Sequence, residues 1–280
     1  MNAMHTDELK STLLEGYQMR RTRKQKDAFI EWACRYAQAL GVSAAVEEGG
    51  KYIRSRNIVF GDIDRARTII TAHYDTCAWM PTGAGMTPGC WPLIVIIELI
   101  QMLFLLPILL IMFFGPSNRH TANDNTSGVL VVLRLMEKLR DKPGVAFVLL
   151  DNEEIGLLGS QAFIKAHPQA ARRFLLNLDC VGDGRTLLYT GSKLGMKMPQ
   201  AKRLTAAMEE IAPQHGMQTV SGPFPKWLYP SDQMLFPRGT AIAALKGKRI
   251  LYLNRIHTHR DTVLEGENID CLMDVIAKGL

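Results

Sequence analysis

The chain has 280 residues, an apolar fraction of 47% and a formal net charge of +6. This length supports one large domain with a sizeable core, so we expect a single domain over residues 1–280. The densest basic run, residues 20–26, contains no aromatic side chain. That composition favours a solvated face, and we expect no nucleic-acid partner.

The cysteine pattern and the first residues bear on the compartment. Five cysteines form no C-x-x-C pair, and their odd number is typical of reduced thiols in a cytosolic protein. Residues 1–17 carry charged and polar side chains where a secretory signal would need a continuous apolar stretch. We therefore expect a cytoplasmic protein, free or attached to the cytoplasmic face of the membrane.

The spacing of apolar residues predicts the elements in chain order. Helical spacing predicts two N-terminal helices within about residues 7–40, and β-branched or alternating stretches predict strands at 51–60 and 67–72. After an apolar insert, we expect helices at 126–140, 157–167, 199–211 and from about 268, strands at 145–150, 174–178, 186–189, near 241 and at 250–253, and a polar loop at 222–230. Strands that alternate with helices predict an α/β fold with a mixed, mainly parallel sheet and helices on both faces.

Polar residues follow three of these predicted strands. They are His73 and Asp75, Glu153 and Glu154, and Asp179. Because ligands bind at the carboxyl ends of strands in an open α/β sheet, these side chains should meet. The first pair suits a metal ligand and its carboxylate partner, although an ordinary polar strand end has the same pattern. The adjacent acids suit a cation, although a helix N-terminus also attracts acids.

Two further candidates are ambiguous when taken alone. Asp124 directly precedes a predicted helix, where an N-cap role would explain it equally well. His257 lies close to a second imidazole, His259, and a histidine in a surface loop would give the same pattern.

Taken in order, however, the fragments resemble the co-catalytic zinc aminopeptidase family of the zinc exopeptidases. The matching fragments are His73-Tyr74-Asp75, Asp124-Asn125-Thr126-Ser127-Gly128, Glu153-Glu154, Asn177-Leu178-Asp179-Cys180-Val181-Gly182, Ser231-Asp232 and His257-Thr258-His259-Arg260-Asp261-Thr262. The resemblance runs from about Lys51 to the C-terminus. It implies two zinc ions with these ligands: His73 and Asp179 for one, Glu154 and His257 for the other, and Asp124 bridging both.

The resemblance also implies a mechanism. Two zinc ions would activate a water, and Glu153 would take its proton during attack on a peptide carbonyl and then protonate the leaving amine. Asp75 would orient His73, and Asp261 would do the same for His257.

Other residues near these fragments have less certain roles. Tyr229 and Asp232 resemble the substrate-binding segment of the family, with Tyr229 as an oxyanion donor or as a packing aromatic. Gln233 stands where many members have His, which leaves the details of substrate contact open. Cys77 and Cys180 flank candidate site residues but lie on predicted buried segments, so we expect both to pack without taking part.

Residues 91–114 form an almost wholly apolar insert. A single membrane span is excluded, because His73 and Asp124 would then lie on opposite sides of the bilayer. The remaining structures are a re-entrant hairpin broken at Pro107, an interfacial helix pair, or an arm packed against another subunit. We favour a hairpin that contacts a membrane surface or a second copy of the chain. A buried pair of core helices and an apolar wall for substrate side chains are the alternatives.

The combined features predict a zinc-dependent exopeptidase acting on peptides. Because the family it resembles is dominated by aminopeptidases, we expect release of N-terminal residues. Two alternatives stay open. Glutaminyl cyclase shares the fold and several ligands but uses one zinc, and a membrane-associated binding protein would have kept the fold and lost catalysis.

Overall fold

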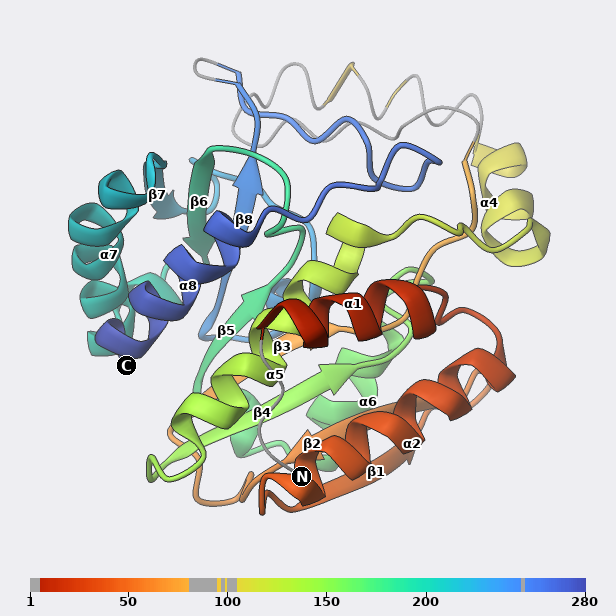
Figure 1. The fold of residues 1–280 in the computed structure, drawn as a ribbon, viewed down its shortest axis with the longest axis horizontal. Helices are drawn as coiled ribbons and strands as arrows, with labels where there is room; N and C mark the ends of the chain where they lie inside the picture. The colour runs from red at the N-terminus through yellow and green to blue at the C-terminus, as the bar shows by residue number, and fades with distance from the viewer. Residues whose placement is uncertain (1–5, 81–94, 97–98, 100–104, 248–249) are drawn as a thin grey trace.

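The computed structural model describes residues 6–80, 95–96, 99, 105–247 and 250–280, and Figure 1 shows their arrangement. The strands form one sheet in the order β1-β2-β4-β3-β5-β8-β6-β7. They are β1 (Ala44–Gly49), β2 (Ser55–Phe60), β3 (Thr68–His73), β4 (Val145–Leu150), β5 (Phe174–Leu178), β6 (Thr186–Gly191), β7 (Gln218–Pro223) and β8 (Gly239–Leu245). The central strands β4, β3, β5 and β8 are parallel, whereas β1–β2, β2–β4 and β6–β8 pair antiparallel. The predicted mixed, mainly parallel sheet is therefore confirmed.

Helices cover both faces of this sheet, as predicted (Figure 1). The helices on the two faces are α1 (Thr6–Gly16), α2 (Arg23–Ala39), α5 (Gly128–Leu139), α6 (Leu158–Ala166), α7 (Pro199–Ile211) and α8 (Gly266–Gly279). Helix α4 (Leu105–Phe114) lies away from the sheet (Figure 1). Residues of α1, α2, α5, α7 and α8 share one core with Ile70 of β3, whereas α6 shares the opposite core with Ile69. Neighbouring residues of a central strand thus face different cores, which explains its continuous apolar sequence.

Two strands were missed, and two predicted strands differ from the structure. The edge strands β1 and β7 were missed, because β1 has a largely exposed surface and carries Glu47 and Glu48, which lower its strand propensity. Pairing with β2 nevertheless makes β1 extended. The strand expected at 51–60 begins only at Ser55. The one expected at 250–253 is instead an isolated bridge between Lys246 and Tyr252.

Helix α4 is the described part of the apolar insert, together with residues 95–96 and 99. Much of the predicted hairpin at 91–114 lies outside the described residues. Within the described part of the chain, every helix is too short or too polar to cross a membrane. Helix α4 is apolar throughout, yet Leu106 and Phe114 are 68% and 83% exposed. The guanidinium of Arg21 donates to the carbonyl oxygens of Met112 and Gly115, which attaches the end of α4 to the segment before α2.

Candidate active site

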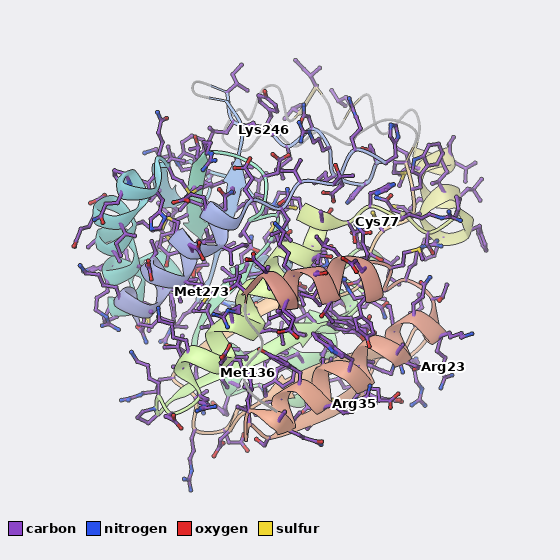
Figure 2. All side chains as sticks on the ribbon, in the orientation of Figure 1. Arg23, Arg35, Cys77, Met136, Lys246 and Met273 are labelled. Atoms are coloured by element: carbon purple, nitrogen blue, oxygen red, sulfur yellow. The ribbon has the colours of Figure 1, made fainter. Side chains whose placement is uncertain are left out.

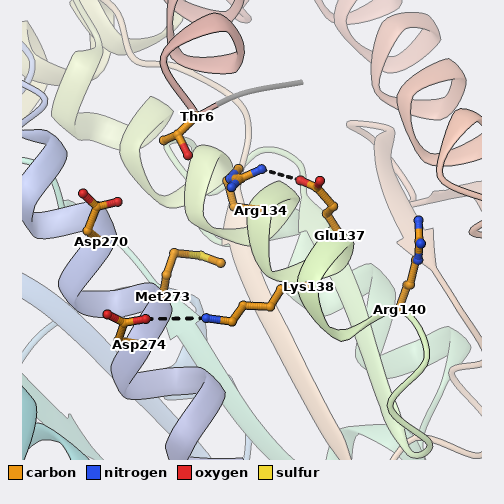
Figure 3. Close-up of a pocket in the computed structure, with 8 residues that line it drawn as sticks. All are labelled: Thr6, Arg134, Glu137, Lys138, Arg140, Asp270, Met273 and Asp274. Atoms are coloured by element: carbon orange, nitrogen blue, oxygen red, sulfur yellow. Dashed lines mark hydrogen bonds and ion pairs between the residues drawn. The ribbon is translucent and has the colours of Figure 1, made fainter. Parts of the chain in front are cut away.

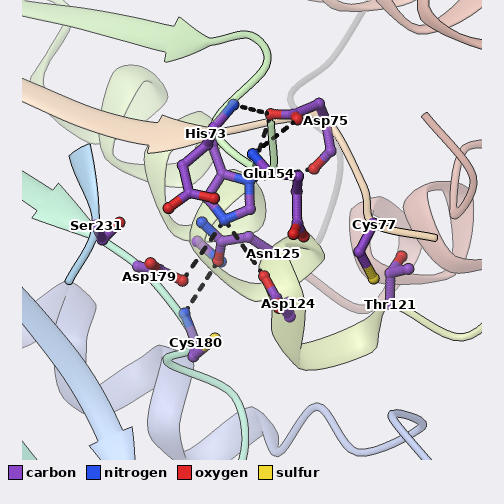
Figure 4. Close-up of polar contacts among 12 residues, drawn as sticks. His73, Asp75, Cys77, Thr121, Asp124, Asn125, Glu154, Asp179, Cys180 and Ser231 are labelled. Atoms are coloured by element: carbon purple, nitrogen blue, oxygen red, sulfur yellow. Dashed lines mark hydrogen bonds and ion pairs between the residues drawn. The ribbon is translucent and has the colours of Figure 1, made fainter. Parts of the chain in front are cut away.

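The carboxyl ends of three central strands bring the predicted polar residues together (Figure 4). His73 is the last residue of β3 and pairs in register with Leu150 of β4, so the turn after β4 emerges beside it. That turn carries Glu153 and Glu154, and Asp179 follows β5 on the other side of β3. The parallel pairing of β4, β3 and β5 therefore determines which side chains meet.

Asp124 comes from the buried turn Ala122–Ser127, which leads into α5. The side-chain amide of Asn125 donates to the carbonyl oxygen of Leu178 at 2.9 Å, and its Oδ1 accepts from the backbone N–H of Gly128 at 3.0 Å. A Cβ at Gly128 would lie 2.4 Å from the Leu178 oxygen, so this close approach requires glycine. The residues around Asp124 thus attach its turn to the end of β5.

The two carboxylate oxygens of Asp124 face different histidines. Its Oδ1 lies 3.3 Å from His73 Nε2, and its Oδ2 lies 2.9 Å from His257 Nε2. His73 Nε2 is also 3.6 Å from Asp179 Oδ1, and His257 Nε2 is 3.3 Å from Glu154 Oε2. Asp124 is therefore placed between two groups of nitrogen and oxygen atoms, whereas the alternative residue His259 is exposed to solvent.

These residues fit a zinc site by their chemistry and by their unsatisfied atoms. Glu154 Oε1 and Asp179 Oδ1 are buried without a hydrogen-bond partner. The ligand atoms of His73, Asp124 and Asp179 lie within 4.8 Å of one another. Imidazole and carboxylate are the ligands of catalytic zinc, and buried polar atoms without partners are rare unless an ion or water completes them.

The electrostatics of the cluster also favour bound cations. Burial raises the pKa of Glu154 to about 8 and that of Glu153 well above its usual range, with neighbouring carboxylates adding to both shifts. Burial alone would lower the pKa of His257, but Glu154 and Asp124 raise it to about 10. So many carboxylates in one buried place repel one another unless cations balance them.

Asp75 supports the turn that carries the two glutamates. Its Oδ1 and Oδ2 accept from the backbone N–H groups of Glu153 at 3.0 Å and Glu154 at 3.2 Å. The His73 Nδ1 lies 3.2 Å from the Asp75 carbonyl oxygen and 3.6 Å from its carboxylate. Asp75 therefore contacts the ring as expected, mainly through its backbone, and also fixes the glutamate turn.

Asp261 has a different partner from the one expected. Its two carboxylate oxygens accept from the backbone N–H groups of Asn123 at 2.7 Å and Asp124 at 3.0 Å. It therefore supports the Asp124 turn through hydrogen bonds, and it acts on His257 only through its charge. The family resemblance had implied His257 as the partner, whereas these contacts span more than 130 residues.

The predicted substrate-binding residues lie beside the cluster. Asp232 Oδ1 accepts from Ser160 Oγ at 2.6 Å, while its buried Oδ2 has no partner, and burial raises the pKa of this carboxyl to about 7. Tyr229 is buried and its hydroxyl donates to the carbonyl oxygen of Asp179 at 3.2 Å. Gln233 is also buried and donates to the Tyr229 carbonyl oxygen. A substrate role for Tyr229 and Asp232 stays a prediction.

Arg20 is a buried residue near the cluster that sequence reasoning missed. Its guanidinium donates to the carbonyl oxygens of Tyr17 and Tyr74 and to Thr126 Oγ1. Burial lowers its pKa to about 10, opposed by the charges of Asp75 and Asp124. No local pattern marks it, because its run of basic neighbours resembles a solvated surface.

A hollow lies between α5 and α8, with Thr6 of α1 in its lining (Figure 3). It is lined by ion pairs, with Arg134 on Glu137 and Lys138 at 3.5 Å from Asp274. Since Asp124 precedes the first residue of α5 and these residues lie near its last, the hollow is separate from the candidate site. We assign it no ligand.

The comparisons with solved structures match nearly the whole chain. The structure is similar to a glutaminyl cyclase from Porphyromonas gingivalis, with a TM-score of 0.70 and 16% identity over 100% of this chain and 98% of that one. A Zn-dependent exopeptidase from Parabacteroides distasonis matches with a TM-score of 0.70 and 15% identity, over 97% and 96% of the two chains. A leucine aminopeptidase precursor from Bacteroides thetaiotaomicron gives 0.68 and 16%, over 99% and 97%. At these identities the likeness shows the fold.

Sequence comparison identifies the family. No curated protein sequence matches the chain. The sequence profile of peptidase family M28 matches residues 59–277, which include every candidate ligand. This agrees with the zinc exopeptidase resemblance expected from the motifs. The chain belongs to peptidase family M28.

Proposed function

We propose that this protein is an aminopeptidase that uses two zinc ions. The observation that carries the proposal is the placement of Asp124, whose two oxygens face His73 and His257 separately. A carboxylate that presents one oxygen to each of two ligand groups suits a bridge between two ions. His73 and Asp179 would complete one group, and Glu154 and His257 the other.

We propose Glu153 as the group that moves the proton. Its carboxylate lies within 4.8 Å of the ligand atoms of His73 and Glu154, while its backbone N–H is held by Asp75. Two zinc ions, when bound, would acidify a water and polarise the peptide carbonyl. A Glu153 carboxylate oxygen would accept the proton of the attacking water and return it to the nitrogen of the leaving amine.

The test combines metal analysis with a substrate panel. We expect about two zinc ions per chain by elemental analysis, as a two-metal site requires, and chelator-sensitive release of the N-terminal residue from aminoacyl chromogenic substrates. Activity that needs a free C-terminus would overturn the aminopeptidase assignment. Absence of both metal and turnover would overturn the proposed function.

Glutaminyl cyclase is the second candidate, because several of the matching structures are described as such enzymes. It would bind one zinc ion and cyclise a peptide with an N-terminal glutamine. The same purified protein should be incubated with a glutaminyl peptide. One zinc ion per chain together with cyclisation would favour this candidate, whereas two ions and hydrolysis would exclude it.

We also propose that α4 rests on an anionic membrane surface. Its exposed side chains are Leu106, Leu109, Leu110, Phe113 and Phe114. Exposed basic residues lie at the start of α2 and after α4, namely Arg23, Lys24 and Arg119, and Figure 2 places Arg23 at the α2 end on the same side of the molecule as α4. An apolar helix beside basic side chains suits the interface of a bilayer that contains anionic lipids.

Sedimentation with lipid vesicles tests this surface. We expect co-sedimentation with vesicles that contain phosphatidylserine, weaker binding to phosphatidylcholine alone, and loss of binding in the double variant Leu106→Ser/Phe114→Ser. Leu194→Ser is the matched control, because Leu194 is also exposed but lies far along the chain from α4. A wild-type dimer that the double variant converts to monomer, without vesicle binding, would show that α4 contacts a second copy instead.

A further inference from the structure

Cys77 lies at the His257 side of the candidate site. It follows β3 by four residues and is 4% exposed. Its Sγ and the ligand atoms of Glu154 and His257 lie within 4.8 Å of one another. Figure 4 shows Cys77 on the same side of the cluster as Glu154. The sequence predicted that this thiol would only pack, because it lies on a predicted buried segment, but its position among ligand atoms favours a different role.

The surroundings of Cys77 are those of a ligand. Glu154, which is only 10% exposed in its side chain, has a buried Oε1 without a partner. The side-chain nitrogen of Asn118 lies 3.9 Å from the Cys77 Sγ as a donor, and the same nitrogen is held by the carbonyl oxygens of His120 and Thr258. The two hydrogen bonds to carbonyl oxygens use both hydrogens of the amide group, so they hold Asn118 in place beside the thiol and leave the sulfur free to bind a metal ion.

We infer that Cys77 is a further ligand of the metal ion that Glu154 and His257 would hold. The inference rests on the proposed metal site and adds a sulfur atom to it. Thiolate is a preferred ligand of zinc, and binding would release the thiol proton to solvent. Cys180, next to Asp179, belongs to none of the ligand groups found among the described residues, so the two site cysteines differ in role.

A sulfur ligand would give the two metal positions chemically different ligand sets. The ion at His73 and Asp179 would have nitrogen and oxygen ligands alone. The ion at His257 would have a softer set that favours zinc and cadmium over manganese or magnesium. The two positions should therefore be separable by the metal that each accepts.

Cobalt substitution tests the inference without measuring activity. The cobalt-loaded wild-type protein should show a thiolate-to-cobalt charge-transfer band in the near ultraviolet, and Cys77→Ser should abolish it. Cys34→Ser is the matched control, because Cys34 lies on α2 away from the site, and Cys180→Ala tests the other site cysteine. Both should keep the band. A band that survives in Cys77→Ser would overturn the inference.

A measurement on the wild-type protein covers the case in which Cys77→Ser does not fold. The cadmium-113 resonance of one of two bound ions should be deshielded, as sulfur ligation requires. Two bound cadmium ions with resonances in the oxygen and nitrogen range would contradict the role of Cys77 while leaving the two-metal proposal intact. Failure to bind any metal would instead overturn the proposed function.

Discussion

The two halves of the candidate site are held in different ways. The strand half, His73 and Asp179, lies at the ends of β3 and β5, with side chains that are 1% and 7% exposed. The loop half, Glu154 and His257, lies on a turn and a loop, and the His257 side chain is 23% exposed. Sheet pairing therefore fixes the strand half, whereas the loop half is the more exposed of the two.

Changing the Asp124 carboxylate, whose two oxygens face one histidine in each half, should have the largest effect. Asp124→Asn leaves a single oxygen in a position that serves two histidines, so we expect loss of bound metal from both halves. Activity should fall by at least about 10⁴-fold, beyond the range for loss of a general base alone. Elemental analysis and aminopeptidase assays measure this, with Asp64→Asn, an exposed acid, as control. Full metal content in Asp124→Asn would mean that Asp124 does not bridge.

Removing the proton acceptor should separate chemistry from metal binding. Glu153→Gln should lower the turnover rate by about 10²–10⁴-fold and leave the metal content unchanged. Glu209→Gln, on the exposed surface of α7, is the control. If the Glu153 variant loses metal as well, the residue is a ligand of the loop half and not the base. Preserved biological activity without turnover would support the binding-protein alternative.

Asp261 should affect metal affinity although it is not a proposed ligand. In Asp261→Asn an amide nitrogen would face one of the backbone N–H groups of Asn123 and Asp124, so the Asp124 turn would loosen. We expect metal affinity to fall by about 10–100-fold, as for other residues that orient ligands. Competition with a chelator measures it, and Asp270→Asn on α8 is the control. Unchanged affinity would show that the other contacts of the turn, such as those of Asn125 and Arg20, hold it without Asp261.

The smallest expected effect is a change in amide hydrogen exchange, and it compares the two halves directly. Metal binding should slow amide hydrogen exchange in the loop at 254–262 more than in β3, because the β3 amides are already paired in the sheet. Exchange measured by mass spectrometry with and without zinc tests this. Equal protection of both segments would mean that the loop half is as rigid as the strand half before metal binds.

The strand half is also the part that sequence alone predicts well. Buried strands such as β3 and β5 appear as apolar runs, so His73 at the end of the first and Asp179 after the second could be placed at one edge of the sheet. Edge strands such as β1 give no such run, because solvent covers one side of them. Periodicity therefore identifies the residues that the central sheet positions.

Contacts between distant loops could not be predicted in the same way. The hydrogen bonds of Asp261 to the Asp124 turn, and the approach of Cys77 to His257, join segments more than 130 residues apart. Nothing in the local spacing encodes which loops meet. The assignment of Asp261 to His257 was wrong for this reason, and Cys77 was taken as a packing residue.

The buried Arg20 couples the N-terminal helices to the candidate site. Helices α1 and α2 lie outside the family match at 59–277, yet the Arg20 guanidinium joins Tyr17 to Tyr74 and Thr126. If metal binding stabilises the packing of α1 and α2, then the packing of α1 and α2 must strengthen metal binding by the same amount. A metal ion that stabilises the Asp124 turn should therefore also stabilise the packing of α1 and α2. A change that weakens this packing should lower metal affinity by the same free energy.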